Sequence, residues 1–136
     1  MSPKRSPVGL VDTSVLVAVK KGRPLQEEAL PERSAVSIVT VAELRAGVLA
    51  APDIESRDRR IVTLEGVAGA AILPVEARVA RVWAAMRACL AASGRGVGVN
   101  DLWIAATAAA HEIPIVTQAR DYDALSGFMG LTVIPV

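Results

Sequence analysis

Four acidic residues lie where apolar segments end or the next segment begins, although they are far apart in the chain. They are Asp12, Glu43, Asp101 and Asp121. Like charges brought within a few ångströms raise one another's pKa or require a cation between them. The chain has one His and one Cys, so the ligands of such a cation would all be oxygen, which suits Mg²⁺ or Mn²⁺. A divalent ion can activate a bound water and stabilise a phosphoryl group, so the pattern predicts phosphodiester hydrolysis.

Each carboxylate also has a purely structural explanation. Asp12 could cap the helix that follows it, Glu43 could form a capping box with Thr40, and Asp101 could satisfy free amides at the positive end of its helix. Capping needs only a short polar side chain, and Ser, Thr or Asn would serve. Acids follow several of the predicted strands in a very apolar chain. The pattern therefore favours a shared functional role for these acids.

The elements that must position these acids follow from the hydrophobic pattern. Strands are expected at residues 8–11, 35–38, 70–73, 115–117 and 131–134. Helices are expected at 14–21, 24–29, 53–66 and 76–92, between Thr40 and Pro52, and from 100 or 101 onward, with a short helix or turn at 121–127. This alternation predicts an α/β protein with a parallel sheet covered on both faces. Since helices begin at the carboxyl ends of such strands, all four acids should lie at one edge of the sheet.

Length and composition limit the alternatives. A chain of 136 residues is expected to form one domain, over residues 8–136, behind a flexible tail of residues 1–7. The net charge of +1 gives no overall basic character, so any site for a polyanion must be local. The hydrophobic content of 52% suggests a surface that meets a partner. Cys89 is the only cysteine and no apolar run reaches the ~18 residues of a spanning helix, so a cytoplasmic protein with no membrane segment is expected.

Four separated segments resemble, in order and spacing, the PIN-domain ribonucleases and, within that family, the VapC toxins of type II toxin–antitoxin systems. The segments are VDTSVL at residues 11–16, VAEL at 41–44, NDLWIAATA at 100–108 and IVTQARDYDAL at 115–125. The resemblance implies a three-layer α/β/α sandwich with a parallel central sheet. It also implies a metal-dependent endoribonuclease that uses Mg²⁺, with Mn²⁺ as the alternative, and acts on RNA. The implied partners are a second copy of the chain, in a homodimer, and a cognate VapB-like antitoxin at the acidic cleft.

Carried over position by position, the resemblance assigns roles to individual residues. It makes Asp12, Glu43 and Asp101 catalytic metal ligands. Many members of the family have a further acid two residues after the threonine, where this chain has Ala119. Asp121 matches the next acidic position and becomes the fourth ligand, while Asp123 is expected at the surface. The supporting polar residues implied around the site are Thr13, Ser14, Asn100 and Thr117.

Weaker signals surround this pattern. Trp83 and Trp103 lie on apolar helices and are expected to pack in the core or in a dimer contact. Four cations follow or flank the acidic edge and could steer RNA, although a solvated surface is the simpler explanation. These cations are Lys20, Lys21, Arg23 and Arg45.

Two rival functions remain open. A phosphatase or phosphotransferase of the aspartyl-phosphate type would use Asp12 as its nucleophile, but VDTSVL lacks the second aspartate that such enzymes normally have two positions later. A degenerate domain that binds RNA or an antitoxin without cleavage is consistent with Ala119.

Overall fold

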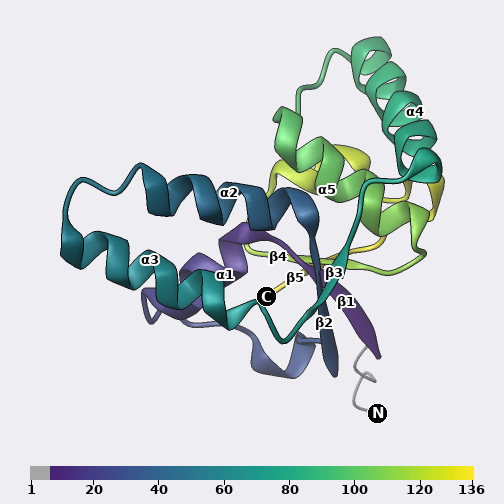
Figure 1. Ribbon diagram of the computed structural model, residues 1–136. Coiled ribbons are helices and arrows are strands. Elements are labelled where there is room, and N and C mark those ends of the chain that lie inside the picture. The colour runs from purple at the N-terminus through teal and green to yellow at the C-terminus, as the bar shows by residue number, and fades with distance from the viewer. Residues whose placement is uncertain (1–6) are drawn as a thin grey trace.

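The computed structural model describes residues 7–136, which contain a parallel β-sheet with helices on both faces (Figure 1). The sheet of this part of the chain has the strand order β3-β2-β1-β4-β5, so β1 is central and the carboxyl ends of the strands share one edge. The predicted flexible tail, residues 1–7, lies outside the described residues except for Pro7. The strands are β1 (Val8–Val11), β2 (Arg33–Ser37), β3 (Ala71–Leu73), β4 (Ile115–Thr117) and β5 (Val133–Pro135).

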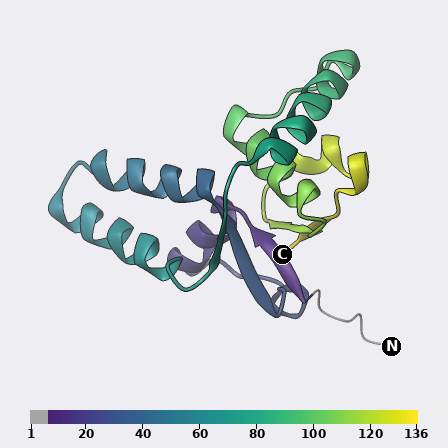
Figure 2. The same cartoon turned by 45° about the vertical axis from the view of Figure 1, so that its right-hand side comes forward.

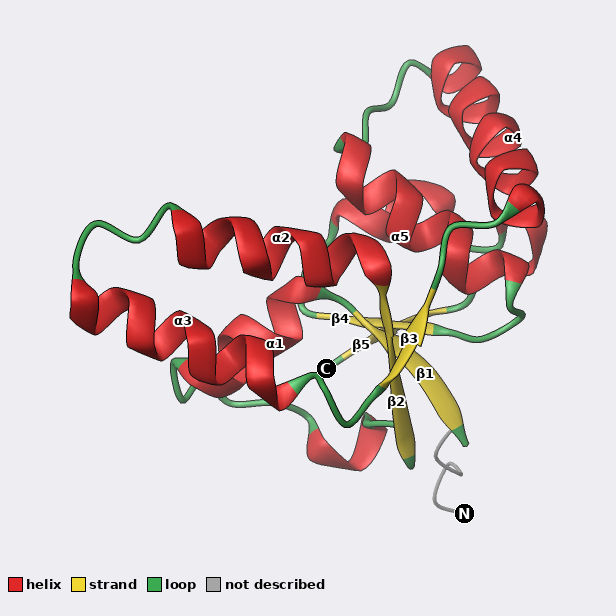
Figure 3. Cartoon of the chain, viewed as in Figure 1, coloured by secondary structure: helices red, strands yellow, loops and turns green. Residues whose placement is uncertain are grey.

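Helices form the two outer layers (Figure 3). On one face α4, α5 and η2 pack on Leu10 and Ile115, and on the other α1 packs on Val11 and Val116. The predicted α/β/α sandwich with a parallel sheet is therefore confirmed. Among residues 7–136, none of the helices has the length and apolar character needed to cross a membrane. The helices are α1 (Thr13–Lys20), α2 (Ile38–Leu49), α3 (Ile54–Gly66), α4 (Ala77–Ser93) and α5 (Val99–Ala110), with short 3₁₀ turns η1 (Glu27–Ala29), η2 (Asp121–Leu125) and η3 (Phe128–Gly130).

The second and third helices form a hairpin that extends from the sheet. In Figures 1 and 2, α2 and α3 run side by side away from the strands, while α4 and α5 lie on the opposite side of the molecule. The two hairpin helices pack against each other, α2 also contacts α5, and α3 contacts α1. A concave surface is thereby formed where α1, α2 and α3 meet.

The start of α2 corrects the sequence-based prediction. Strand β2 ends at Ser37, not at residue 38, because the Ser37 hydroxyl accepts a hydrogen bond from the Val39 N–H at 3.0 Å and caps the helix. Thr40 therefore lies inside the first turn, fully buried, and its hydroxyl has no hydrogen-bond partner among residues 7–136. The predicted capping box between Thr40 and Glu43 is wrong, which removes the structural explanation for Glu43.

The Ala-rich helix α5 is the most buried helix of the fold. Seven of its residues are buried, from Leu102 and Ile104 through to Ala109. It begins at Val99, one or two residues earlier than predicted, and its N-cap is Gly98, which carries no side chain. Asp101 makes no capping hydrogen bond, so this part of its structural explanation is wrong, although it does lie in the first turn, at the positive end of the helix.

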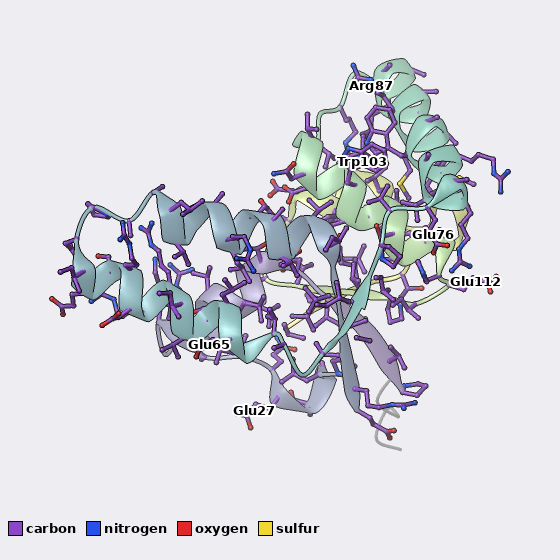
Figure 4. The ribbon with its side chains drawn as sticks, viewed as in Figure 1. Glu27, Glu65, Glu76, Arg87, Trp103 and Glu112 are labelled. Atoms are coloured by element: carbon purple, nitrogen blue, oxygen red, sulfur yellow. The ribbon has the colours of Figure 1, made fainter. Side chains whose placement is uncertain are left out.

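The two tryptophans pack against each other between α4 and α5. Trp103 lies beside α4 (Figure 4), and its ring stacks on Trp83 with centroids 4.8 Å apart and planes 14° apart. The Arg87 guanidinium lies 5.7 Å from the centroid of the Trp83 ring. The expectation that these rings serve packing is consistent with this intramolecular stack.

Candidate metal centre

Asp12 lies at the carboxyl end of the central strand and is held there by hydroxyl groups. It is 3% exposed and is the N-cap of α1, accepting the Ser14 N–H at 3.1 Å. The Ser14 hydroxyl donates to Oδ1 at 2.6 Å, and the Thr117 hydroxyl donates to Oδ2 at 2.8 Å. Burial raises the pKa of Asp12 despite these hydrogen bonds, which act in the opposite direction. The capping explanation for Asp12 is therefore correct, and the side chain nevertheless carries a charge that its surroundings do not fully compensate.

A second layer of hydrogen bonds fixes the two hydroxyls that hold Asp12. The Gln118 N–H donates to the Ser14 Oγ at 2.9 Å, and the Ala119 N–H donates to the Thr117 Oγ1 at 2.8 Å. The two hydroxyl oxygens themselves lie 3.3 Å apart. Backbone amides just after β4 thus orient the hydroxyls, and the hydroxyls orient the carboxylate.

Glu43 joins three helices at the rim of the same site. It is half-buried on α2, and the Thr13 hydroxyl, at the start of α1, donates to its Oε1 at 3.1 Å. The Asn100 side-chain amide, in the first turn of α5, donates to its Oε2 at 3.4 Å. Within residues 7–136, the side chains of Thr13 and Asn100 therefore form hydrogen bonds with Glu43, and not with Asp12 or Asp101.

Asp101 shows most directly that the acids converge. Burial raises the pKa of Asp101, and the negative charges of Asp121, Asp12 and Glu43 raise it further, although a hydrogen bond from Tyr122 opposes them. These three acids come from three other segments of the chain. Carboxylates from three other segments are therefore close enough to Asp101 to act on its charge.

The fourth predicted ligand, Asp121, differs from the other three in its surroundings. It is exposed at the start of η2, and its link to the site is the effect of its charge on Asp101. The neighbouring Asp123 is exposed and lies 3.7 Å from the Arg120 guanidinium. Asp121 thus acts on the site through its charge, whereas Asp123 belongs to a surface ion pair.

Tyr122 is a member of the site that sequence reasoning missed. Its ring is fully buried, and its hydroxyl donates to Asp101 Oδ1 at 3.2 Å. Burial and the charges of Asp12, Asp101 and Glu43 raise its pKa, so the phenol stays protonated and remains a donor. The signal available in the sequence was the only tyrosine of the chain, placed between two acids.

The donor set fits a hard divalent cation in its chemistry. The converging groups are carboxylates and hydroxyls, the ligands of Mg²⁺ and Mn²⁺, and their mutual repulsion is what a bound cation would relieve. Within residues 7–136, no three Asp, Glu, His or Cys side chains are near enough to one another to hold one ion without side-chain movement. Glu43 has more freedom to move than Asp12, because it is half-exposed and its two hydrogen bonds are 3.1 and 3.4 Å long.

The fold is an α/β/α sandwich whose parallel sheet carries acids at its carboxyl edge, and comparison with known proteins identifies its family. The sequence pattern of the PIN domain family matches residues 9–127, so the chain belongs to that family. It is 49% identical to Ribonuclease VapC5 of Mycobacterium tuberculosis over 94% of this chain and 95% of that protein. It is 37% identical to Ribonuclease VapC4 of the same organism over 91% of this chain and 95% of that protein.

Solved structures have the same fold. The crystal structure of VapBC-5 from Mycobacterium tuberculosis, described as a member of the VapBC family of toxin–antitoxin systems, contains a chain with 47% identity and a TM-score of 0.89. The match covers 96% of this chain and 99% of that one. VapBC-1 from nontypeable Haemophilus influenzae matches with a TM-score of 0.77 over 94% of this chain and 97% of that one; at 23% identity, this similarity concerns the fold alone.

Proposed function

We propose that this protein is a metal-dependent endoribonuclease and the toxin of a toxin–antitoxin pair. The observation that supports this most strongly is the convergence on Asp101 of three acids from other segments, in a chain whose similar proteins are named ribonucleases. Membership of the PIN domain family supports the same activity. The proposed reaction is hydrolysis of RNA phosphodiester bonds.

The proposed ligands are Asp12, Glu43 and Asp101, with Asp121 as an outer fourth acid. Mg²⁺, or Mn²⁺ in its place, would neutralise charge on the phosphate and lower the pKa of the attacking water. The chain's own part is to hold the acids in place before substrate arrives.

The hydroxyl and amide groups around the acids give the site its preorganisation. Two donors on opposite oxygens fix the plane of the Asp12 carboxylate, since Ser14 binds one oxygen and Thr117 the other. The Tyr122 hydroxyl donates to Oδ1 of Asp101, and Oδ2 has no hydrogen bond within residues 7–136. Positioning groups of this kind are as important to a metal site as the ligands themselves.

The aspartyl-phosphate alternative fits the surroundings of Asp12 poorly. A carboxylate nucleophile must present a free oxygen to phosphorus, whereas both oxygens of Asp12 accept hydrogen bonds and the side chain is 3% exposed. A ligand role needs no covalent attack and is compatible with these contacts.

The proposed partners are a cognate VapB-like antitoxin that blocks the acidic cleft, and a second copy of the chain. Support for the antitoxin comes from the VapBC-5 complex, whose matched chain is 47% identical to this one. Sedimentation of the purified chain tests the homodimer, and the proposed place of action is the cytoplasm, where RNA and antitoxin are both present.

Cleavage of a structured RNA tests the proposed activity. The wild type is expected to cleave with Mg²⁺ and to stop when EDTA is added, and Asp12→Ala is expected to be inactive under both conditions. Asp58→Asn, which neutralises an exposed acid on α3, serves as the matched control and is expected to cleave normally. Equal RNA decay in wild type and Asp12→Ala would contradict the proposal.

The second candidate is a non-cleaving domain that binds RNA or its antitoxin. Ala119 favours this alternative, because many members of the family have an acid at that position. It is also favoured because, within residues 7–136, no three acidic side chains form a group that could hold a metal ion. Binding of the RNA by wild type without any product would select this alternative.

A further inference from the structure

A cavity of about 440 Å³ lies between α1, α2 and α3, next to the acidic site. Glu43 lines it at one end, which makes it continuous with the proposed metal centre. Four cations line it farther along: Lys20 and Lys21 from the end of α1, and Arg59 and Arg60 from α3. We call this cavity, with its four cations, the basic groove.

The cations of the basic groove are brought together by the fold. Lys20 and Arg59 are far apart in the sequence, yet the charges of Arg59, Arg60 and Lys21 lower the pKa of Lys20, in addition to a larger effect of desolvation. Arg60 is held in place because its Nη1 donates to the Gly47 carbonyl at 2.6 Å. Four positive charges are therefore concentrated in one hollow of a chain whose net charge is only +1.

Acids also lie near these cations, since Glu43 lines the groove and the charges of Arg59 and Arg60 act on Asp53. Of the four cations, Arg59 alone forms an ion pair among residues 7–136, with Glu55 at 3.2 Å, and both side chains of that pair are exposed. A concentration of unpaired cations in a concave surface attracts an anion with several charges. A single small anion would leave the repulsion around Lys20 largely in place.

The direction of the groove relates it to the acidic site. Helix α1 begins at Thr13, which contacts Glu43, and ends at Lys20, about 10 Å away at 1.5 Å per residue. A nucleic-acid strand that rises ~3.4 Å per nucleotide covers that length in about three steps. The four cations line the same hollow as Glu43, so a strand bound there would adjoin the acidic site.

We propose that the basic groove binds the phosphates that neighbour the cleaved phosphodiester bond in the same RNA strand. This inference rests on the proposed nuclease function. The groove would set the path of the strand and hold it by charge, without reading the bases. An acidic peptide is the competing occupant, and the experiment includes a probe for it.

The test compares two double variants with equal loss of charge. Lys20→Gln/Arg59→Gln removes two cations of the groove, and Arg33→Gln/Arg81→Gln removes two exposed cations on β2 and α4, outside it. Binding of a fluorescent single-stranded RNA is measured by anisotropy in EDTA at several salt concentrations. The same proteins are titrated with poly-L-glutamate, and RNA cleavage is followed with Mg²⁺.

The groove variant is expected to bind RNA about 10-fold more weakly, and its slope of log affinity against log salt should fall by about 1.4, since each phosphate contact contributes ~0.7 for a single strand. The control variant should keep the wild-type slope. Equal losses in both variants would overturn the inference, as would lost affinity for poly-L-glutamate with RNA binding unchanged. If the wild type neither bound nor cleaved RNA, both the groove proposal and the proposed nuclease function would be contradicted. If the wild type cleaved RNA and the groove variant bound RNA equally well, only the proposal about the groove would be contradicted.

Discussion

Replacing Asp12 by Asn should stabilise the metal-free protein, although it removes a proposed catalytic group. The buried carboxylate has donors on both oxygens, yet burial raises its pKa, which means that desolvation outweighs those hydrogen bonds. Asn keeps one oxygen as the acceptor for the Ser14 N–H and remains a good N-cap. The Thr117 hydroxyl would turn toward the Ser14 Oγ, 3.3 Å away, to receive the new amide.

The size of the gain follows from two opposing effects. Removing an uncompensated buried charge relieves on the order of 1–3 kcal/mol, and weakening the charged hydrogen bonds loses about 1 kcal/mol. A net gain of about 1 kcal/mol is expected at pH 7. For a chain of this length the melting temperature should rise by about 3–5 °C. Asp58→Asn, an exposed control with the same change of charge, should shift stability by less than about 0.5 kcal/mol.

The dependence on pH separates this charge effect from a change in packing. Because the folded pKa of Asp12 is raised above its usual 3.8, its stabilising contribution is complete below pH 3.8 and is lost as pH rises through the folded value. The advantage of Asn over Asp should therefore be absent in acid and grow toward neutral pH. The assay is urea unfolding in EDTA at several pH values.

Addition of Mg²⁺ should reverse the order of stability. A ligand at 100 times its Kd stabilises the folded state by about 2.7 kcal/mol, and this gain should be smaller for the Asn variant than for the wild type. An Asn variant that is less stable than wild type in EDTA, by an amount independent of pH, would refute the reasoning that Asp12 carries an uncompensated charge.

Three further substitutions test other parts of the site and fold. Tyr122→Phe removes the hydroxyl that binds Asp101, and calorimetric titration with Mn²⁺ should show affinity reduced about 10- to 100-fold, whereas Thr107→Val, which removes a hydroxyl elsewhere on α5, should leave the affinity unchanged. Ala119→Asp introduces an acid near the site and should raise the affinity for Mn²⁺ in the same titration. Unchanged Mn²⁺ affinity and an unchanged rate of RNA cleavage would show that Ala119 does not weaken metal binding. Gly9→Ala should destabilise the fold by about 1–3 kcal/mol in urea unfolding, because the new Cβ would lie 2.9 Å from Val116 Cγ2.

The sheet and its acidic edge were predictable because they depend on the order of short apolar runs. Strands at 8–11 and 115–117 have the predicted bounds, and their parallel direction was expected because helices alternate with strands along the chain. Asp12 follows a strand and Asp101 follows a loop, at the start of a helix. In a parallel sheet, the direction of the chain brings both positions to the carboxyl edge.

The details that failed depend on competition between neighbouring polar groups. Ser37 and Thr40 are both acceptable N-caps in sequence, and only the extended backbone at Ser37, with φ −69° and ψ 144°, decides between them. The contact of Tyr122 with Asp101 joins residues 21 positions apart and depends on how η2 packs under α5. The basic groove likewise exists only because α3 folds back beside α1.

The central claim, that acids from separate segments jointly bind one divalent cation, is tested most directly by an anomalous difference map from crystals grown with Mn²⁺. We expect a peak in contact with the carboxylates of Asp12 and Asp101, with Glu43 turned from Asn100 toward it, and no peak there in Asp12→Asn crystals. An empty site at a Mn²⁺ concentration that supports RNA cleavage, or a peak at other residues, would contradict the account.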